Sequence, residues 1–162
     1  TGLYTAIGRL AGNATEVAAA IDAFAHAVAA NPNDPGAHKY LAGAFLQQDR
    51  VDEAFIEFLA TLLIDPLDAD AHAGIGRIHL DAGRYADAVE ALRRAVDVAP
   101  NDTEARYALA TALTRLGKTQ EAAQEFDRVE EAQHRAFAER RRKMSLDVLK
   151  EEAARRAAEV GR

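Results

Sequence analysis

Apolar and small residues return along this chain every 34 residues and keep one phase over most of its length. Between these markers, apolar positions recur at the three- and four-residue spacing of amphipathic helices, and short polar turns separate them. A period of this length is typical of helix pairs that stack into an array. The positions that keep it are Ile7, Leu41, Ile75 and Leu109; Ala20, Ala54, Ala88 and Ala122; Phe24, Phe58, Leu92 and Phe126; and Pro32, Pro66 and Pro100.

The period predicts an all-α chain with five parts in one continuous domain. The parts are residues 1–34, an irregular first repeat; residues 35–68; residues 69–102; residues 103–136; and residues 137–162, a charged C-terminal segment. In the first part we expect a helix over about residues 3–11, a turn at Gly12 and Asn13, and a second helix that ends near Ala30. Terminal repeats are often atypical, because one of their faces has no neighbour.

Turn residues support these boundaries. Pro32 cannot continue a helix, Asp34 can cap the next one, and Pro35 suits a first helical position. Within the third repeat, Gly83 is expected to end a helix in the left-handed conformation. The pair Asp49 and Arg50 is expected to form the corresponding turn of the second repeat.

The last segment is predicted to be a helix that covers the exposed end of the stack. Neither glycine nor proline occurs from Lys118 to Val160, and the residues there are good helix formers. A thin apolar stripe is formed by Phe137, Met144, Val148 and Leu149. The pattern leaves open whether this helix breaks from the preceding one near Gln133. It also leaves open self-association through the stripe.

Charge divides the chain into two regions. Residues 1–134 hold 11 basic and 21 acidic residues, a net of −10, whereas residues 135–162 hold 9 and 5, a net of +4. The total of −6 argues against a dedicated nucleic-acid binder, and no apolar run is long enough for a membrane span. The basic run at residues 140–143 is interpreted as a solvated helix face that offsets the acidic body, rather than as a nucleic-acid or membrane site.

Compartment is not decided by these features. The absence of cysteine excludes disulfides and thiolate metal sites, but it suits both reducing and oxidising surroundings. We expect a cytoplasmic protein, with a periplasmic one as the alternative if a signal segment has been removed ahead of Thr1. The alanine-, arginine- and aspartate-rich composition is typical of a bacterial protein.

The repeat resembles the tetratricopeptide repeat (TPR) over roughly residues 1–136. That family places small residues where paired helices approach closely, and its turn pair is matched by Gly83 and Tyr85. The family's tryptophan at the fourth position is replaced by Tyr4, His38, His72 and Arg106. The small positions are Gly8, Ala42, Gly76 and Ala110; Ala20, Ala54, Ala88 and Ala122; and Ala27, Thr61, Ala95 and Val129. The resemblance implies a right-handed α–α superhelix of about four helix-turn-helix repeats plus a C-terminal capping helix.

The resemblance also implies a concave groove lined by the first helix of each repeat. The groove positions fall on Arg9, Lys39, Tyr40, Leu46, Gln47, Arg77, Leu80, Tyr107, Thr111 and Arg115. Because four of these are cations in an acidic protein, we expect a protein or peptide partner with acidic and apolar side chains. The alternative is a solvated inner face whose real contacts lie elsewhere. The carboxylate clamp of chaperone-binding TPR modules is not matched, since only Lys39 is in place and Glu104 would repel a carboxylate.

No catalytic or metal constellation is found in the sequence. His72 and His79 lie two helical turns apart, but no third ligand stands at a suitable spacing, so we interpret them as packing histidines. Phosphate loops, nucleophile elbows and paired-carboxylate signatures are absent, so neither a cofactor nor an enzyme activity is expected. The sequence therefore predicts a non-catalytic scaffold or adaptor. The alternatives are a module of a larger bacterial assembly, secretion or enzyme complex, and a self-assembling structural module.

Overall fold

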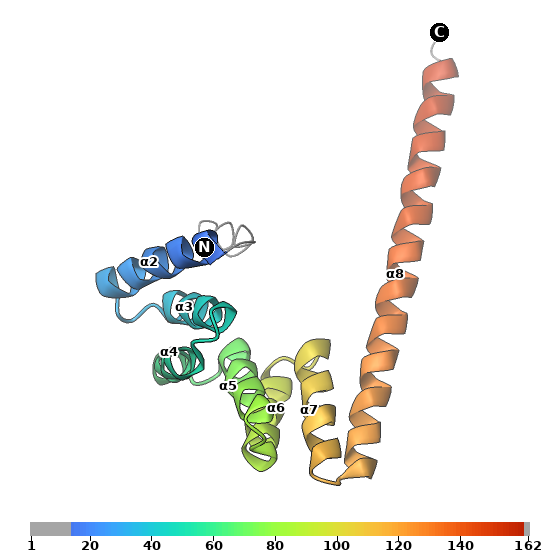
Figure 1. The fold of residues 1–162 in the computed structure, drawn as a ribbon. Coiled ribbons are helices and arrows are strands. Elements are labelled where there is room, and N and C mark those ends of the chain that lie inside the picture. Colours follow the sequence, from blue (N-terminus) through green and yellow to red (C-terminus); the bar gives the residue numbers. More distant parts are fainter. Residues whose placement is uncertain (1–13, 161–162) are drawn as a thin grey trace.

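The computed structural model describes residues 14–160 (Figure 1). For residues 14, 148–149 and 151–160 it describes the backbone only. Within that range the chain forms seven helices and no strand. They are α2 (Ala14–Ala30), α3 (Pro35–Gln47), α4 (Val51–Ile64), α5 (Ala69–Asp81), α6 (Tyr85–Val98), α7 (Thr103–Arg115) and α8 (Thr119–Val160). The helix and turn expected within residues 3–13, and Arg9 with them, lie outside the described residues.

The helices form stacked hairpins that follow one another along a right-handed α–α superhelix (Figure 1). Helix α3 pairs with α4, α5 with α6, and α7 with the first part of α8, while α2 packs on α3. Helix α5 also contacts α3 on one side and α7 on the other, so these first helices lie side by side. Each hairpin buries one apolar face against the next. The buried apolar residues form two clusters, one reaching from α2 to α6 and the other from α5 to α8.

An aspartate begins each of three first helices. The side chains of Asp34, Asp68 and Asp102 all accept hydrogen bonds from backbone amides in the first turn of α3, α5 and α7. Such a cap typically stabilises a helix by about 1 kcal/mol. Because these residues recur 34 positions apart, the loops between repeats share one geometry.

A left-handed residue ends the first helix of each hairpin. Gly83 and Gly117 have φ angles of 73° and 75°, and Asp49 takes the same conformation with a φ of 59°. The expected turn at Asp49 and Arg50 is therefore confirmed, although the residue differs from glycine. Aspartate tolerates this region better than most residues because its short side chain can bond locally.

Small residues allow the helices of a hairpin to approach closely, as the sequence predicted. Ala54 and Thr61 of α4 and Ala88 and Ala95 of α6 have no exposed surface. A Cβ atom added at Gly76 of α5 would lie 2.5 Å from Leu92 Cγ of its hairpin partner α6. Each close contact thus needs a small residue on one helix as much as a large residue on the other.

The residue at the fourth position of each of these repeats hydrogen-bonds to the loop that precedes it. His38 Nε2 and His72 Nε2 each lie 3.0 Å from the carbonyl oxygens of Pro32 and Pro66, and Arg106 donates to Pro100 O at 2.7 Å. His38 also lies 2.6 Å from Glu57, and Arg106 pairs with Glu125 at 2.5 Å. These hydrogen bonds and ion pairs are made by the residues that replace the family's tryptophan.

Helix α8 differs from the expected cap. It runs unbroken past Gln133, and only its first part is buried against α7, at Ala122 and Val129. Beyond the stack it projects freely in Figure 1, with Phe137 64% and Met144 66% exposed. The part of α8 that covers the α7 end is about residues 119–132, and the described side chains of residues 137–147 are exposed, because no proline or glycine turns the chain back. The side chains of Val148 and Leu149 lie outside the described residues.

Over the described part of the chain, no helix combines the length and the apolarity that crossing a lipid bilayer requires.

Candidate functional site

A hollow of about 250 Å³ lies on the concave face, between α3, α5 and α7. Its lining consists of Lys39, Tyr40 and Gly43 of α3, Phe58 of α4, Asp70, Ala73 and Arg77 of α5, and Asp102, Glu104 and Ala105 of α7. Three of the groove residues predicted from the sequence, Lys39, Tyr40 and Arg77, therefore meet in one place. We call this hollow the inner groove.

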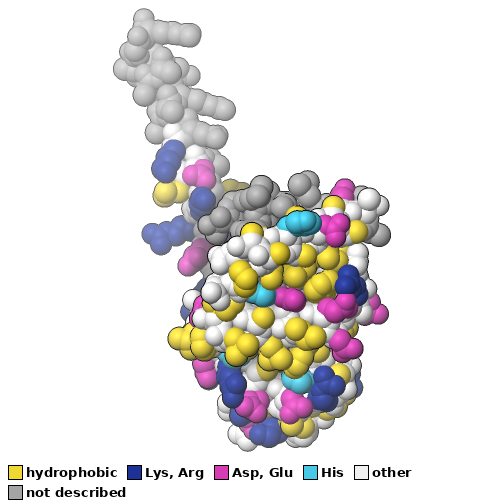
Figure 2. All heavy atoms as spheres, turned by 90° about the vertical axis from the view of Figure 1, so that its left-hand side faces the viewer, with side chains coloured by type: hydrophobic (Ala, Val, Ile, Leu, Met, Phe, Trp, Pro, Cys, Tyr) yellow, Lys and Arg dark blue, Asp and Glu magenta, His cyan; other side chains and the backbone are white. Residues whose placement is uncertain are grey.

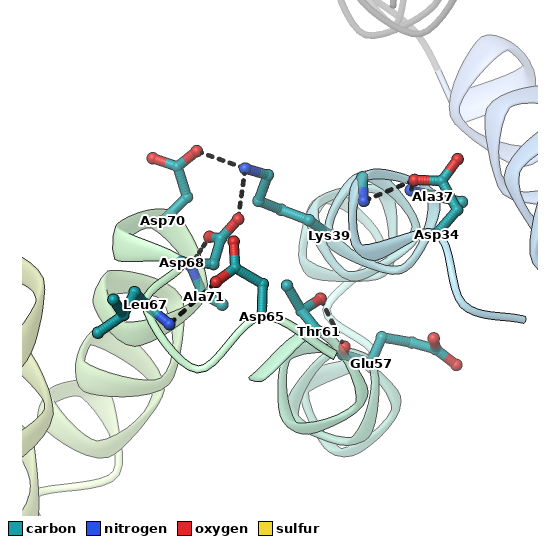
Figure 3. Close-up of polar contacts among 11 residues, drawn as sticks. Asp34, Ala37, Lys39, Glu57, Thr61, Asp65, Leu67, Asp68, Asp70 and Ala71 are labelled. Carbon is teal, nitrogen blue, oxygen red and sulfur yellow. Dashed lines mark hydrogen bonds and ion pairs between the residues drawn. The ribbon is translucent and has the colours of Figure 1, made fainter. Parts of the chain in front are cut away.

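Lys39 reaches from α3 to the beginning of α5 (Figure 3). Its Nζ donates to Asp68 Oδ2 at 2.8 Å and to Asp70 Oδ2 at 2.9 Å. Burial by itself would lower the pKa of Lys39, but hydrogen bonds and charge from both aspartates outweigh it, so the pKa lies above its ordinary value. The stabilisation from this contact is present below the pKa of the unfolded chain and is lost as pH rises through the raised pKa.

Arg77 carries the second cation of the inner groove. It forms an ion pair with Glu104 of α7, and the two side chains are 44% and 77% exposed. An exposed pair of this kind contributes about 0–1 kcal/mol, because water screens both charges. Both cations thus face carboxylates of the chain itself, which the sequence pattern did not indicate.

The other predicted groove residues lie along the first helices outside this hollow. Leu46 and Leu80 are half-buried against the core. Tyr107 packs edge-on against Phe126 of α8, with ring centroids 5.5 Å apart. Thr111 Oγ1 donates to the carbonyl oxygen of Tyr107 at 2.9 Å, while Gln47 and Arg115 are exposed at the ends of their helices.

Phe58 is the lining residue that sequence reasoning missed. It belongs to a second helix, which the repeat pattern assigns away from the concave face, and it is 5% exposed. Its ring occupies the space beside Gly74, where a Cβ atom would collide with it. The sequence signal that could have indicated this contact is the glycine at position 74, which leaves room for a large side chain such as Phe58.

A second hollow of about 400 Å³ lies on the opposite face, between α4 and α6 and above α5. We call it the outer groove, and it is lined by Phe55, Leu59 and Leu62; His72, Ile75 and His79; and Asp87, Glu90, Ala91 and Arg94. Figure 2 shows hydrophobic side chains gathered over this face. The sequence pattern did not single it out, because the resemblance places the binding surface on the first helices, whereas this groove is lined mainly by the second helices α4 and α6.

The two histidines of the outer groove have packing partners. His79 Nδ1 accepts a hydrogen bond from Arg84 Nε at 2.9 Å, and its ring meets Phe55 edge-on at 5.6 Å. Among the residues that the structure describes, no three or more histidine, aspartate or glutamate side chains cluster as metal ligands. The interpretation of both residues as packing histidines fits this geometry.

Two curated proteins are similar in sequence. The chain is 32% identical over 112 residues to Small glutamine-rich tetratricopeptide repeat-containing protein 2 of Mycosarcoma maydis, covering 69% of this chain and 32% of that protein. It is 31% identical over 81 residues to Superkiller protein 3 of Schizosaccharomyces pombe, covering 50% and 6%. The chain thus spans about a third of the first relative and a small part of the second.

Solved structures share the fold. A crystal structure of MamA matches with a TM-score of 0.71 at 19% identity, over 81% of this chain and 77% of that one. The structure of YrrB, described as a TPR protein with an unusual peptide-binding site, matches with a TM-score of 0.66 at 23% identity, over 80% and 66%. At these identities the likeness establishes the stacked-hairpin architecture.

The repeat phase, the capped hairpins and the small-residue contacts all agree with one family description. The model of the tetratricopeptide repeat matches residues 5–72 and 73–136, which together make up most of the sequence. The chain belongs to the tetratricopeptide repeat family.

Proposed function

We propose that this protein is a non-catalytic scaffold or adaptor that holds a segment of a partner protein in the inner groove. Tetratricopeptide repeats are generally non-catalytic modules that bind proteins or peptides. The observation that carries the proposal is the hollow in which three successive first helices place charged groups beside Tyr40 and Phe58. A concave site with a few polar groups on an apolar floor is the usual form of a recognition site.

The charges of the inner groove narrow the kind of segment. Lys39 is held by two carboxylates, whereas Arg77 has one exposed partner, Glu104. A carboxylate of the bound segment therefore replaces Glu104 as the ion-pair partner of Arg77. Lys39 keeps its contacts with Asp68 and Asp70, which join α3 to the beginning of α5. An apolar side chain next to that carboxylate lies against Tyr40 and Phe58. The expected partner is thus a segment with one acidic and one neighbouring apolar side chain.

The experiment is a selection of random peptides from a display library against the whole chain. Selected peptides should share an acidic–apolar pair, and their affinity for an Arg77→Glu variant should fall by about tenfold or more, since like charges replace an ion pair. Affinities are measured by fluorescence anisotropy with labelled peptides.

The matched control is Arg94→Glu, which makes the same charge change on the opposite face. The control should bind the selected peptides like the unchanged chain. Peptides that lose affinity with Arg94→Glu but not with Arg77→Glu would place binding on the outer face and reject the inner groove. A library that yields no binder would reject the peptide-binding proposal as a whole.

A second proposal concerns the setting of this module. Because the chain spans 32% of one relative and 6% of another, we infer that the repeats serve as one interaction module within a larger protein or assembly. Detection of the native polypeptide with an antibody against residues 35–136 tests this directly. A native species of about 17.5 kDa that migrates alone would reject it.

A further inference from the structure

The outer groove has a counterpart one repeat later. A hollow of about 210 Å³ between α6 and α8 is lined by Arg93, Val96, Asp97, Leu109, Leu113, Glu121, Gln124, Glu125 and Arg128. Eight of these positions lie 34 residues after lining residues of the outer groove. We call this hollow the charged groove. The two hollows are therefore the same feature of the repeat with different side chains.

The charged groove is closed by its own ion pairs. Arg93 pairs with Glu121 across the hollow, and Arg106 and Arg128 both pair with Glu125. In the outer groove, Leu59 stands at the position of Arg93 and Ala91 at the position of Glu125. Among the described residues, no ion pair crosses the outer groove, since Arg94 pairs with Glu90 of its own helix, so the apolar floor stays open.

Apolar surface also surrounds the outer groove. Leu59 is 42% exposed, and Ile56 and Leu63, three and four residues away on α4, are more exposed still, with Leu63 reaching 85%. Asp87 lies at one edge and forms no ion pair among the described residues. A contiguous apolar surface with an unpaired acid at its edge indicates a partner that is apolar and basic.

The extension of α8 presents that chemistry. Phe137 and Met144 lie seven residues apart, hence on one side of the helix and about 10 Å from each other. Arg140 and Arg141 fall between them on the same side, and all four are exposed. Phe55 and Leu62 of the outer groove are also seven residues apart on α4, so the apolar spacings match.

The extension cannot reach the outer groove of its own chain. Helix α8 is continuous from Thr119 to Val160, its first part is packed on α7, and the remainder runs away from the stack (Figures 1 and 2). Folding back would require a break in a segment without glycine or proline. Contact between these two surfaces must therefore join separate copies.

We propose that the Phe137–Met144 face of α8 in one copy docks into the outer groove of a second copy. Phe137 and Met144 contact Phe55 and Leu62, on either side of Leu59, and Arg140 or Arg141 pairs with Asp87. The contact joins two different surfaces, so reciprocal exchange gives a closed dimer and one-way docking gives a growing chain. This interface uses neither Arg77 nor Tyr40, so it is independent of peptide binding in the inner groove.

The test is sedimentation velocity of the whole chain over a concentration series. The unchanged chain should associate, and Leu59→Arg should weaken association by about tenfold or more, because a guanidinium closes the groove on Asp87 as Arg93 does on Glu121. Phe137→Glu should weaken it similarly from the other side. The matched control Ala123→Arg adds a cation at an exposed site on α8 next to the stack and should leave association unchanged. Circular dichroism verifies that each variant is folded.

Mixing the two variants gives the decisive result. Leu59→Arg retains a functional α8, and Phe137→Glu retains an open outer groove, so the mixture should form a one-to-one complex at concentrations where each variant alone no longer associates. If only Phe137→Glu weakens association and mixing restores nothing, the α8 helices pair with each other and the proposal is overturned. A chain that is monomeric throughout the series overturns it as well.

Discussion

The outer groove and the charged groove occupy the same positions of successive repeats and differ most in the residues that face solvent. Their floors are alike, with Ile75 in one and Leu109 in the other. At the rim, Leu59 is replaced by Arg93, and the charged groove has about half the volume of the outer one. The repeat thus keeps an apolar floor, while the rim position of Leu59 and Arg93 and the largely buried position of Ala91 and Glu125 diverge and determine whether a groove is open to a partner.

The largest effect is expected from removing the ion pair beneath the charged groove. Arg106 and Glu125 are only 11% and 13% exposed, and Arg106 also fastens Pro100 O. Arg106→Ala leaves Glu125 buried with only Arg128 nearby, so we expect a loss of about 3 kcal/mol in the free energy of unfolding. Urea denaturation followed by circular dichroism measures it.

The control for Arg106→Ala is Arg93→Ala, which removes an exposed pair from the same groove. It should cost less than about 1 kcal/mol. Equal losses from the two variants would contradict the distinction between a buried pair and a surface pair on which this prediction depends.

The next effect concerns a contact between α4 and α5 at the inner groove. Phe58 faces Gly74, whereas the residues 34 positions later are Leu92 and Ala108. Gly74→Ala introduces a collision with the ring and should destabilise the chain by about 1–3 kcal/mol. The double variant Phe58→Leu with Gly74→Ala copies the later repeat and should recover most of that loss in thermal denaturation.

Gly43→Ala is the matched control for Gly74→Ala. A Cβ atom there meets nothing within 4 Å, so the substitution should stabilise α3 by about 0.5–1 kcal/mol through helix propensity. Destabilisation by both variants would contradict the assignment of the Gly74→Ala loss to the collision with Phe58.

A smaller effect on stability is expected when the charged groove is converted into an apolar one. Arg93→Leu places leucine where Leu59 stands in the outer groove and removes the exposed pair with Glu121. Its cost should stay below about 1 kcal/mol. Sedimentation velocity should show stronger self-association than the unchanged chain, since a second apolar groove is opened. Unchanged association would mean that rim chemistry does not control docking.

The smallest effect compares the turns that end the first helix of successive hairpins. Asp49 adopts the left-handed conformation that Gly83 and Gly117 occupy elsewhere. Asp49→Gly should therefore stabilise the chain by at most about 1 kcal/mol. It removes the strain of a left-handed aspartate in the folded chain, but glycine has more backbone freedom to lose from the unfolded chain, which offsets most of the gain. Gly83→Asp is the reverse substitution and should destabilise. A denaturation midpoint that moves in the same direction for both would contradict this account.

The stacked-hairpin fold was predictable because its determinants are local. Asp34 caps the helix that follows it, Pro32 stops the one before, and the left-handed turn needs only Asp49 or Gly83 and their neighbours. Small residues such as Ala54 and Ala88 recur at the repeat spacing because every hairpin has the same close approach. Periodicity therefore predicts both where helices lie and which of their faces are buried.

The candidate site was predictable only in part. The repeat phase placed Lys39, Tyr40 and Arg77 together in the inner groove, but it could not show that the two cations face Asp68, Asp70 and Glu104. Those pairings join residues 27 to 31 positions apart, and they depend on how one hairpin is rotated against the next. The conclusion that Arg77, rather than Lys39, is available to a partner follows from that rotation.

By itself the sequence determined the helices, their order, their capped ends and the small contacts within each pair, because these depend on residues close together or on one repeated spacing. Only the tertiary structure decided that α8 leaves the stack as a single helix and that Leu59 and Asp87 share an open groove. The physical reason is that a groove needs side chains from two hairpins at once, and the angle between hairpins is set by the packing of many residues.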